Sequence, residues 1–309
     1  MNLEHELHKT SGFTNLELLA REVVEGFIAG MHKSPFHGFS AEFAEHKIYN
    51  RGESTRHIDW KLFAKTDKLY TKRYDEETNL RCHVILDNSA SMHYPSLDEV
   101  NLTSLNKIAF SSLAAASIMH ILKKQRDAVG LSIYSDAYDF YAPEKGSERH
   151  HRMLLDQLNK AIINKSKTAP TNTYQYLHHI AEKIHRRSLI FLFTDMFQTT
   201  VGNNELFEAL RHLKYNKHEV VLFHVFDKAK EFQFNFDNTP RRFVDVETNE
   251  HLDLYAENIK DAYETKVQEY FNNIKLNCGQ YQIKYVEADI NQNFDKILTT
   301  FMLERQKFV

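Results

Sequence analysis

The sequence has few of the residues on which disulfide-rich and membrane proteins depend. It contains two cysteines in 309 residues, Cys82 and Cys278, which are too few for a disulfide framework. No Cys/His spacing resembles a zinc site. No run of about 18 apolar residues occurs, which excludes an ordinary transmembrane helix. Residues 1–6 lack the basic region and the apolar core of a signal peptide, so we expect a cytoplasmic protein without a membrane span.

Glycine and proline are also scarce, with 9 and 5 residues, and neither gathers into a low-complexity linker. An apolar fraction of 42% and a charged fraction of 26% are typical of a globular protein. The net charge is −3, so nucleic acid is not attracted to the molecule as a whole. A basic stretch over residues 61–73 could bind RNA, but no RNA-binding motif accompanies it and we expect a solvated face.

From residue 80 onward, apolar runs alternate with helical patterns. The apolar runs predict strands at 84–86, 128–134, 189–193, 220–226 and 281–286. The helical patterns predict helices at 105–119, 147–163, 174–186, 204–213, 254–277 and from 293. A further strand at 137–141 would pair antiparallel with its predecessor. Strands separated by helices of this length predict an α/β fold, with a doubly wound, mostly parallel sheet flanked by helices. The phenylalanine-rich segment at about 228–250 interrupts the alternation and is interpreted as a hairpin insertion.

The first 79 residues have a different pattern. A capping box at Thr14 and Glu17 opens a helix predicted from about Asn15 to Gly30. Short extended pieces separated by turns follow over 34–79 and indicate a small, mainly β subdomain. We therefore divide the chain into an N-terminal helix and β subdomain at 1–79 and a main domain at 80–309.

Three oxygen-bearing side chains, Asp87, Ser89 and Ser91, directly follow the apolar residues 84–86. A tight loop at the end of a strand can turn alternate side chains toward one point. One carboxylate and two hydroxyls are hard oxygen donors, which suit Mg²⁺ or Mn²⁺. The alternative is an ordinary turn in which the three side chains bond only to the backbone.

Two later loops carry further oxygen donors toward the same expected edge of the sheet. Thr173 is predicted to cap the helix at 174–186, and Asp195 follows the strand at 189–193. In an open parallel sheet, ligands bind beyond the carboxyl ends of the strands at a topological switch point. Five donors from three segments therefore favour a metal site over an ordinary turn.

The pattern Asp87-x-Ser89-x-Ser91, with the later Thr173 and Asp195, resembles the metal-ion-dependent adhesion site of the von Willebrand factor A domain. The resemblance implies that the two serines and the threonine ligate the metal directly. It implies that the two aspartates hold metal-bound waters. It also implies an open coordination position, which a Glu or Asp of a partner protein completes.

The threonine loop departs from the family pattern. Glycine usually stands two residues before that threonine, whereas this chain has Thr171. Thr171 is therefore the alternative ligand, although Thr173 is preferred because it immediately precedes the predicted helix.

The segment before the main domain narrows the resemblance to the family called domain of unknown function 58. The residues that resemble its signature are Gly38-x-x-x-Glu42-Phe43, Tyr49-x-x-Gly52 and Arg56-x-Ile58-Asp59-Trp60 followed by Ala64-Lys65. Members of that family resemble partners of MoxR-type AAA+ ATPases, which are thought to act as chaperone-like machines. The resemblance implies an adapter between such an ATPase and client proteins. Arg56 and Asp59 form either a structural ion pair or part of a partner-binding surface.

An enzyme is the competing interpretation, for instance a Mg²⁺-dependent phosphohydrolase with Asp87 as nucleophile. Such an enzyme would need a second carboxylate where Ser89 stands and a lysine beside the acidic edge. A phosphate-cradling loop of the Gly-x-x-x-x-Gly-Lys type is also missing from the sequence. We therefore expect a binding module rather than an enzyme.

Overall fold

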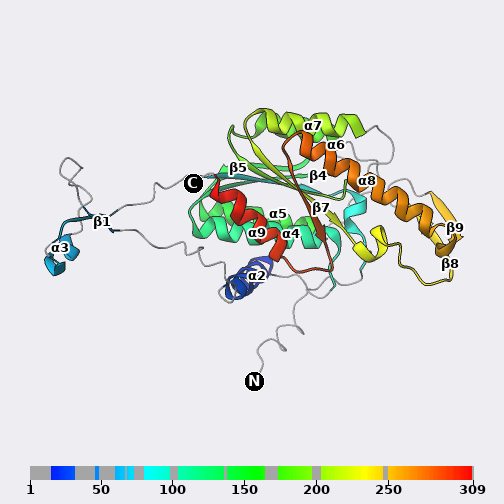
Figure 1. Ribbon diagram of the computed structural model, residues 1–309, viewed down its shortest axis with the longest axis horizontal. Coiled ribbons are helices and arrows are strands. Elements are labelled where there is room, and N and C mark those ends of the chain that lie inside the picture. The colour runs from blue at the N-terminus through cyan, green and yellow to red at the C-terminus, as the bar shows by residue number, and fades with distance from the viewer. Residues whose placement is uncertain are drawn as a thin grey trace, which may run out of the picture.

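The computed structural model describes residues 15–31, 46–48, 60–66, 68–72, 80–97, 104–135, 138–163, 173–196, 203–245 and 250–307. Its centre is a six-stranded sheet with the strand order β10-β7-β6-β3-β4-β5 (Figure 1). The strands are β3 (Arg81–Asp87), β4 (Ala128–Tyr134), β5 (Tyr138–Lys145), β6 (Leu189–Thr194), β7 (Glu219–Phe226) and β10 (Lys284–Asp289). All neighbouring strands are parallel except β4 and β5, so the predicted α/β fold with a mostly parallel sheet is confirmed.

Helices cover both faces of the sheet (Figure 1). One face carries α2 (Leu16–Met31), α4 (Lys107–Lys124), α5 (Glu148–Ile163) and α9 (Asp295–Gln306), and the other carries α6 (Thr173–Lys183), α7 (Asn203–Tyr215) and α8 (Lys260–Gln280). Strand residues alternate between the two cores, as the period of two requires. Val84 and Leu86 pack in the first core, and Ile85 packs in the second.

The order of the strands places a topological switch point between β3 and β6. The chain runs from β3 outward to β4 and β5, then returns to β6 on the other side of β3 and continues to β7 and β10. Leu86 of β3 pairs with Phe193 of β6, so these two strands end at the same level. The loops after β3 and β6 therefore meet where ligands bind in folds of this kind.

The N-terminal helix α2 belongs to the main domain, which corrects our grouping of it with residues 34–79. Its buried residues Leu16, Ala20, Val24 and Phe27 fall on one helical face and join the same core as α4. Packing this apolar face against α4 removes it from water.

Leu16→Ala tests this packing. Leu16 is completely buried, so its truncation is expected to lower the free energy of unfolding by about 2–5 kcal/mol. Leu18→Ala on the same helix is the matched control, because Leu18 is 39% exposed and its truncation should cost under about 0.5 kcal/mol. Urea unfolding measures both, and equal losses would show that α2 does not use this face.

Only short pieces of the expected β subdomain are described. Strands β1 (His46–Ile48) and β2 (Tyr70–Lys72) pair antiparallel, and α3 (Trp60–Thr66) lies between them in the chain. We did not predict this helix, although its interior is rich in good helix formers such as Leu62 and Ala64. Arg56 and Asp59 lie outside the described residues.

The insertion after β7 is a hairpin, but it lies later than predicted. Its strands are β8 (Pro240–Val244) and β9 (His251–Tyr255), so the insertion continues to Tyr255 and α8 begins only at Lys260.

The phenylalanines that precede the hairpin do not form a strand. A π-helical turn, Lys228–Phe232, follows β7, and the rings of Phe234 and Phe236 pack against Phe243. The alternation of phenylalanine with polar residues in this segment reflects packing between aromatic rings. The same alternation in a sequence is typical of a half-buried strand, so the pattern alone does not separate the two.

Candidate functional site

Asp87 ends β3 and points its carboxylate between the two loops of the switch point. One carboxylate oxygen accepts a hydrogen bond of 2.9 Å from the backbone N–H of Ser89. The other accepts a hydrogen bond of 2.7 Å from the hydroxyl of Thr194 at the end of β6. Asp87 is only 3% exposed. Its position is therefore set by both central strands.

The hydroxyls of Ser89 and Ser91 lie next to each other, with their oxygens 3.1 Å apart. Ser89 precedes a short 3-10 turn, Ala90–His93, but its side chain does not cap that turn. Oxygens at neighbouring corners of an octahedron around Mg²⁺, with bonds of about 2.1 Å, are separated by about 3.0 Å. The serine pair thus has the spacing of two neighbouring ligands.

Asp195 follows β6 and is also buried. Its carboxylate accepts a hydrogen bond of 2.8 Å from the ammonium group of Lys107, the first residue of α4. The same ammonium donates to Glu231 of the π-helical turn at 2.6 Å. The second oxygen of Glu231 accepts from the backbone of Asp227 at 2.7 Å, so the turn and the ion pair hold each other in place.

The backbone after β6 is fixed from the opposite side. Nε2 of the buried His224 donates to the carbonyl of Asp195 at 2.9 Å, and the Tyr270 hydroxyl donates to the carbonyl of Met196. Burial lowers the pKa of His224 to about 4, which keeps the ring neutral. Met196 has a φ of 57°, in the left-handed region. These bonds hold the strained loop that presents Asp195.

The charges at this edge favour a cation. Burial and the neighbouring Asp195 raise the pKa of Asp87 to about 6. Burial opposes the charge of Lys107, but Asp195 and Glu231 outweigh it and raise the pKa of the lysine. Asp195 and Glu231 share the ammonium group of Lys107, while Asp87 and Asp195 repel each other, and a divalent cation would relieve this repulsion.

The hydroxyl of Tyr134, at the end of β4, is a further polar group at this edge. It is buried beside Thr194 and Asp87. Burial and Asp87 raise the pKa of this hydroxyl well above its usual value, so it stays protonated.

The structure brings four of the five predicted site residues, Asp87, Ser89, Ser91 and Asp195, to this edge of the sheet. Thr173 is the first residue of α6, whereas we predicted that it caps a helix starting at residue 174. The side chain of Thr173 and the whole of Thr171 lie outside the described residues. Among the residues that are described, no three His, Cys, Asp or Glu side chains converge as a metal would require. A metal here would depend on hydroxyl oxygens, and the Ser89–Ser91 pair fits that requirement.

Lys107 and Glu231 were missed by sequence reasoning. The one usable signal was the position of Lys107 at the start of a helix that is otherwise apolar almost all round. A lysine buried with such a helix indicates an acidic partner, because buried lysines are rare unless they are paired. Nothing in the phenylalanine-rich segment marked Glu231 as its partner, since the contact joins residues 124 positions apart.

A second buried network resembles a nucleophile with its base and acid. His83 contacts the Ser132 hydroxyl through Nε2 at 2.7 Å and the Glu144 carboxylate through Nδ1 at 2.6 Å. Ser132 and His83 are fully buried, and the Glu144 side chain is 2% exposed. A substrate cannot reach the serine, so this network stabilises the sheet rather than catalysing a reaction.

Comparison with known families decides where the chain belongs. Residues 45–271 match the family described as "Protein of unknown function DUF58", which is well over half of the chain. The chain is a DUF58 protein. Within its described residues, no helix is long and apolar enough to cross a bilayer.

The DUF58 chain is similar to uncharacterized proteins of Mycobacterium tuberculosis and Mycobacterium bovis. Each is 23% identical over 140 residues, which cover 45% of this chain and 42% of the relative. The chain thus spans less than half the length of these curated relatives.

Solved structures show only weak likeness to the DUF58 chain. BatB from Bacteroides thetaiotaomicron is 14% identical with a TM-score of 0.44, over 74% of this chain and 99% of BatB. The PilB minor pilin from Streptococcus sanguinis is 10% identical with a TM-score of 0.41, over 78% and 64% of the two chains. Likeness at this level says nothing about function.

Proposed function

We propose that this DUF58 protein is a metal-dependent protein–protein interaction module of the von Willebrand factor A type, and that it acts in the cytoplasm without enzymatic activity. The observation that carries the proposal is the meeting of the Asp87 carboxylate, the Ser89–Ser91 hydroxyl pair and Asp195 at one edge of the sheet. The hard oxygen donors favour Mg²⁺ or Mn²⁺.

The residues at the edge have separate roles in this proposal. The two serine hydroxyls would contact the metal, together with the Thr173 hydroxyl. Asp87, held by Thr194 and the Ser89 backbone, would orient metal-bound water. Lys107 would keep Asp195 in position. The bound metal would supply an open coordination position for a carboxylate of the partner.

The partner follows from the family resemblance. We propose a MoxR-type AAA+ ATPase and its client proteins, with the DUF58 protein as a chaperone-like adapter between them. An exposed Glu or Asp of the partner would dock on the metal, and Arg56 and Asp59 are candidates for a second contact. Binding through one metal-bound carboxylate is reversible by chelation, which suits an adapter that must release its client.

Titration with Mg²⁺ tests the metal site. Isothermal calorimetry should show one site on the native protein and at least about tenfold weaker binding by Asp87→Asn and Ser91→Ala. Asp156→Asn, on the exposed face of α5, is the matched control and should bind like the native protein. Thermal melts confirm that each variant is folded. Equal Mg²⁺ binding by all four proteins would contradict the metal assignment.

One observation favours the alternative, a Mg²⁺-dependent hydrolase with Asp87 as nucleophile. The structure places a lysine, Lys107, beside the acidic edge, where the sequence had shown none. However, its ammonium group already bonds to two carboxylates. Turnover of p-nitrophenyl phosphate with Mg²⁺ that Asp87→Asn abolishes would support the enzyme, and we expect no turnover.

A further inference from the structure

Exposed basic side chains follow the amino edge of the sheet, where the parallel strands begin, opposite the Asp87 edge. Five neighbouring strands each have one at this end or two residues before it, and we call these five the basic row: Lys217 before β7, Arg187 before β6, Arg81 at the start of β3, Arg126 before β4 and Lys145 at the end of β5. Because β5 is antiparallel to β4, its last residue reaches the edge where the other strands begin. Neighbouring strands are about 4.8 Å apart, so the row extends over about 20 Å.

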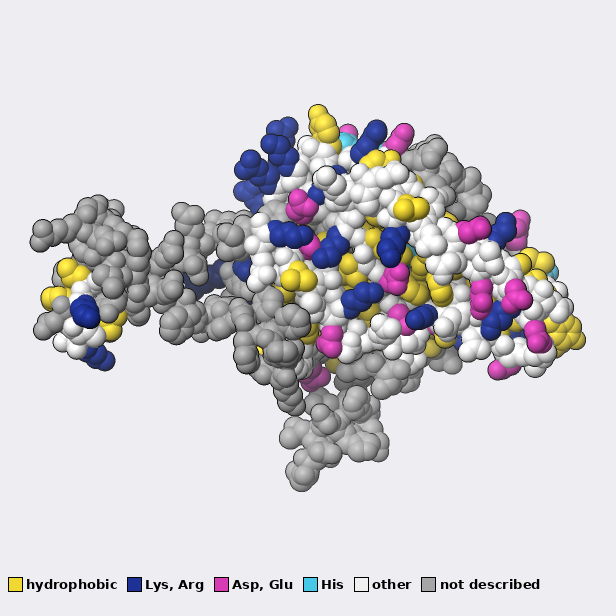
Figure 2. All heavy atoms as spheres, viewed as in Figure 1, with side chains coloured by type: hydrophobic (Ala, Val, Ile, Leu, Met, Phe, Trp, Pro, Cys, Tyr) yellow, Lys and Arg dark blue, Asp and Glu magenta, His cyan; other side chains and the backbone are white. Residues whose placement is uncertain are grey.

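Contacts between loops hold the middle of the basic row together. The backbone N–H of Arg187 donates to the carbonyl of Asn216, in the loop after α7, at 3.3 Å. The guanidinium group of Arg81 donates to Nδ1 of His185, in the loop that carries Arg187, at 3.3 Å. Arg186 in this loop is also exposed and adds to the positive charge. Figure 2 shows Lys and Arg side chains that project together at the upper left, beside the C-terminal end of α7.

Three members of the basic row have an uncommon backbone conformation. Arg126, Arg187 and Lys217 have φ values of 60°, 60° and 61°, in the left-handed region. Glycine is the usual residue in this conformation after a helix, because it has no Cβ atom. Each of the three preceding helices already has a lysine in its last turn, so the helix dipoles do not require a further charge after the helix. Basic residues thus occupy corners where the local structure favours glycine.

The acids near this edge do not neutralise the row. The side chains of Glu144 and Asp127 are buried and bonded inside the protein, and Glu219 is paired at 2.5 Å with Lys214, which is not part of the row. Glu182, at the end of α6, is exposed and offsets one charge. No ion pair joins the first three residues of the row to an acid within the described ranges. Residues 73–79, which precede β3 and include three acids and one arginine, lie outside those ranges.

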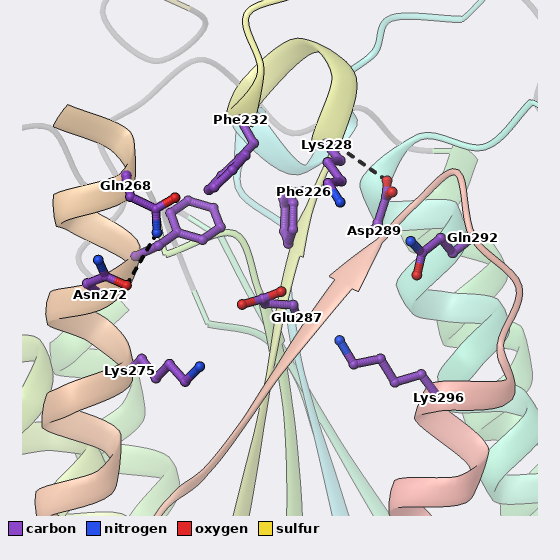
Figure 3. Close-up of a pocket in the computed structure, with 11 residues that line it drawn as sticks. Phe226, Lys228, Phe232, Gln268, Asn272, Lys275, Glu287, Asp289, Gln292 and Lys296 are labelled. Atoms are coloured by element: carbon purple, nitrogen blue, oxygen red, sulfur yellow. Dashed lines mark hydrogen bonds between the residues drawn. The ribbon is translucent and has the colours of Figure 1, made fainter. Parts of the chain in front are cut away.

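The lysines of the pocket between α8 and α9 differ from the basic row, because acids lie among them. In this pocket of about 290 Å³, Glu287 stands between Lys275 and Lys296, and Asp289 stands close to Lys228 (Figure 3). The pocket thus has mixed charge, and an anion has no clear advantage there.

The strand ends at the two edges of the sheet carry opposite charge. At the carboxyl edge, Asp87 ends β3, Asp289 ends β10, and Asp195 and Asp227 directly follow β6 and β7. Arg81 and Asp87 are the first and last residues of one strand, which separates them by about 20 Å. Charges divided in this way orient a molecule whose net charge is only −3, with its basic row toward an anionic surface. The Asp87 edge then faces away from that surface.

An exposed tyrosine stands at one end of the basic row. Tyr215 is the last residue of α7, two residues before Lys217, and it is 82% exposed. Tyrosine is enriched at membrane–water interfaces, where its ring lies among the lipid headgroups. Proteins that bind single-stranded nucleic acid instead use a positively charged groove that follows the backbone. A row of charges at the corners of a sheet edge, with an exposed ring at its end, fits a plane of headgroups better than a strand of RNA.

We propose that the basic row and Tyr215 bind the surface of a membrane that contains anionic phospholipids. Lipid phosphates would lie among the guanidinium and ammonium groups, and the tyrosine ring would enter the headgroup layer. This binding is peripheral and requires no helix that crosses the bilayer. It would leave the Asp87 edge directed away from the membrane and open to a protein partner.

Co-sedimentation of the full chain with phospholipid vesicles tests the proposal. A chelator is present throughout, so that no metal at the Asp87 edge can bridge to a lipid phosphate. The native protein should bind vesicles of phosphatidylcholine with about 30% phosphatidylglycerol, and it should not bind vesicles of phosphatidylcholine alone. Salt at about 0.5 M should release it, because the contacts are exposed and screened.

Variants of the basic row and a matched control locate the binding surface. One basic side chain near an anionic membrane contributes about fivefold to binding, so Arg187→Gln/Lys217→Gln should bind about 25-fold more weakly. Lys228→Gln/Lys266→Gln removes the same charge from exposed residues outside the row and should bind like the native protein. Tyr215→Ser should also weaken binding. All of these residues are exposed, so the variants should fold normally, and thermal melts verify this.

The proposal is overturned if the native protein does not sediment with the anionic vesicles, or if the row variant and the control variant bind equally. It is also overturned if single-stranded RNA binds more tightly than the vesicles in the same buffer, or if Tyr215→Ser binds like the native protein, since either result indicates a general anion surface. Asp87→Asn should bind the vesicles unchanged. The outcome for the basic row is therefore independent of the outcome for the metal site.

Discussion

Replacement of Lys107 by methionine is expected to lower the free energy of unfolding by about 3–5 kcal/mol. Lys107 is 1% exposed, and its ammonium group is bonded to both Asp195 and Glu231. Methionine fills nearly the same volume, so the loss comes from two carboxylates left together in the interior without their cation. Breaking a buried ion pair by removing one partner has this large cost, whereas removing the whole set of charges does not.

Two further variants test whether the loss of stability comes from the unpaired carboxylates or from replacing any lysine of α4 by methionine. Lys123→Met lies on the same helix, but Lys123 is half-exposed and its pairs with Glu17 and Glu148 are at the surface. It should cost under about 1 kcal/mol. The double variant Lys107→Met/Glu231→Gln removes one of the two stranded charges and should be more stable than Lys107→Met alone. Urea unfolding in the presence of a chelator measures all three, and a loss no larger than that of Lys123→Met would contradict the buried pair.

Gly130→Ala is expected to lower the free energy of unfolding by about 3 kcal/mol or more. Gly130 lies in β4 directly opposite His83 of β3, beside an irregularity in the pairing of β4 with β5. A Cβ atom there would lie 2.5 Å from Nδ1 of His83 and 2.8 Å from the carbonyl oxygen of Ala142. The backbone of β5 cannot move without breaking the sheet, so the ring must leave its position and lose its bond to Glu144.

Gly146→Ala is the matched control for this substitution. A Cβ atom at Gly146 would have its nearest neighbour, the carbonyl oxygen of Asp127, at 3.6 Å, which is an ordinary contact. Its substitution should therefore change stability by less than about 1 kcal/mol. If the two alanine variants unfold at the same urea concentration, His83 does not occupy the space beside Gly130.

The central sheet was predictable because its strands are buried on both faces and are separated by helices. The strands at 128–134 and 189–193 were placed within one residue of β4 and β6. The meeting of Asp87 and Asp195 was also predictable, since parallel strands on either side of a switch point end at one edge. Local pattern and topology were sufficient for these features.

The ion pair behind the edge could not be predicted in the same way. Lys107 and Asp195 are 88 positions apart, and their contact depends on how α4 packs against the sheet. The start of α8 was placed too early for a related reason: residues 251–255 alternate in polarity and gain their strand conformation only by pairing with β8. Pairing partners across the chain are tertiary information, which single-sequence periodicity lacks.

Capture of a MoxR-type ATPase by the immobilised protein tests the central claim most directly. With Mg²⁺ present, the native protein should retain the ATPase, and a chelator should release it. Ser91→Ala should retain little ATPase under either condition, while Asp156→Asn should behave like the native protein. Retention that is the same with and without chelator, and the same for Ser91→Ala, would contradict docking through a metal at the Asp87 edge.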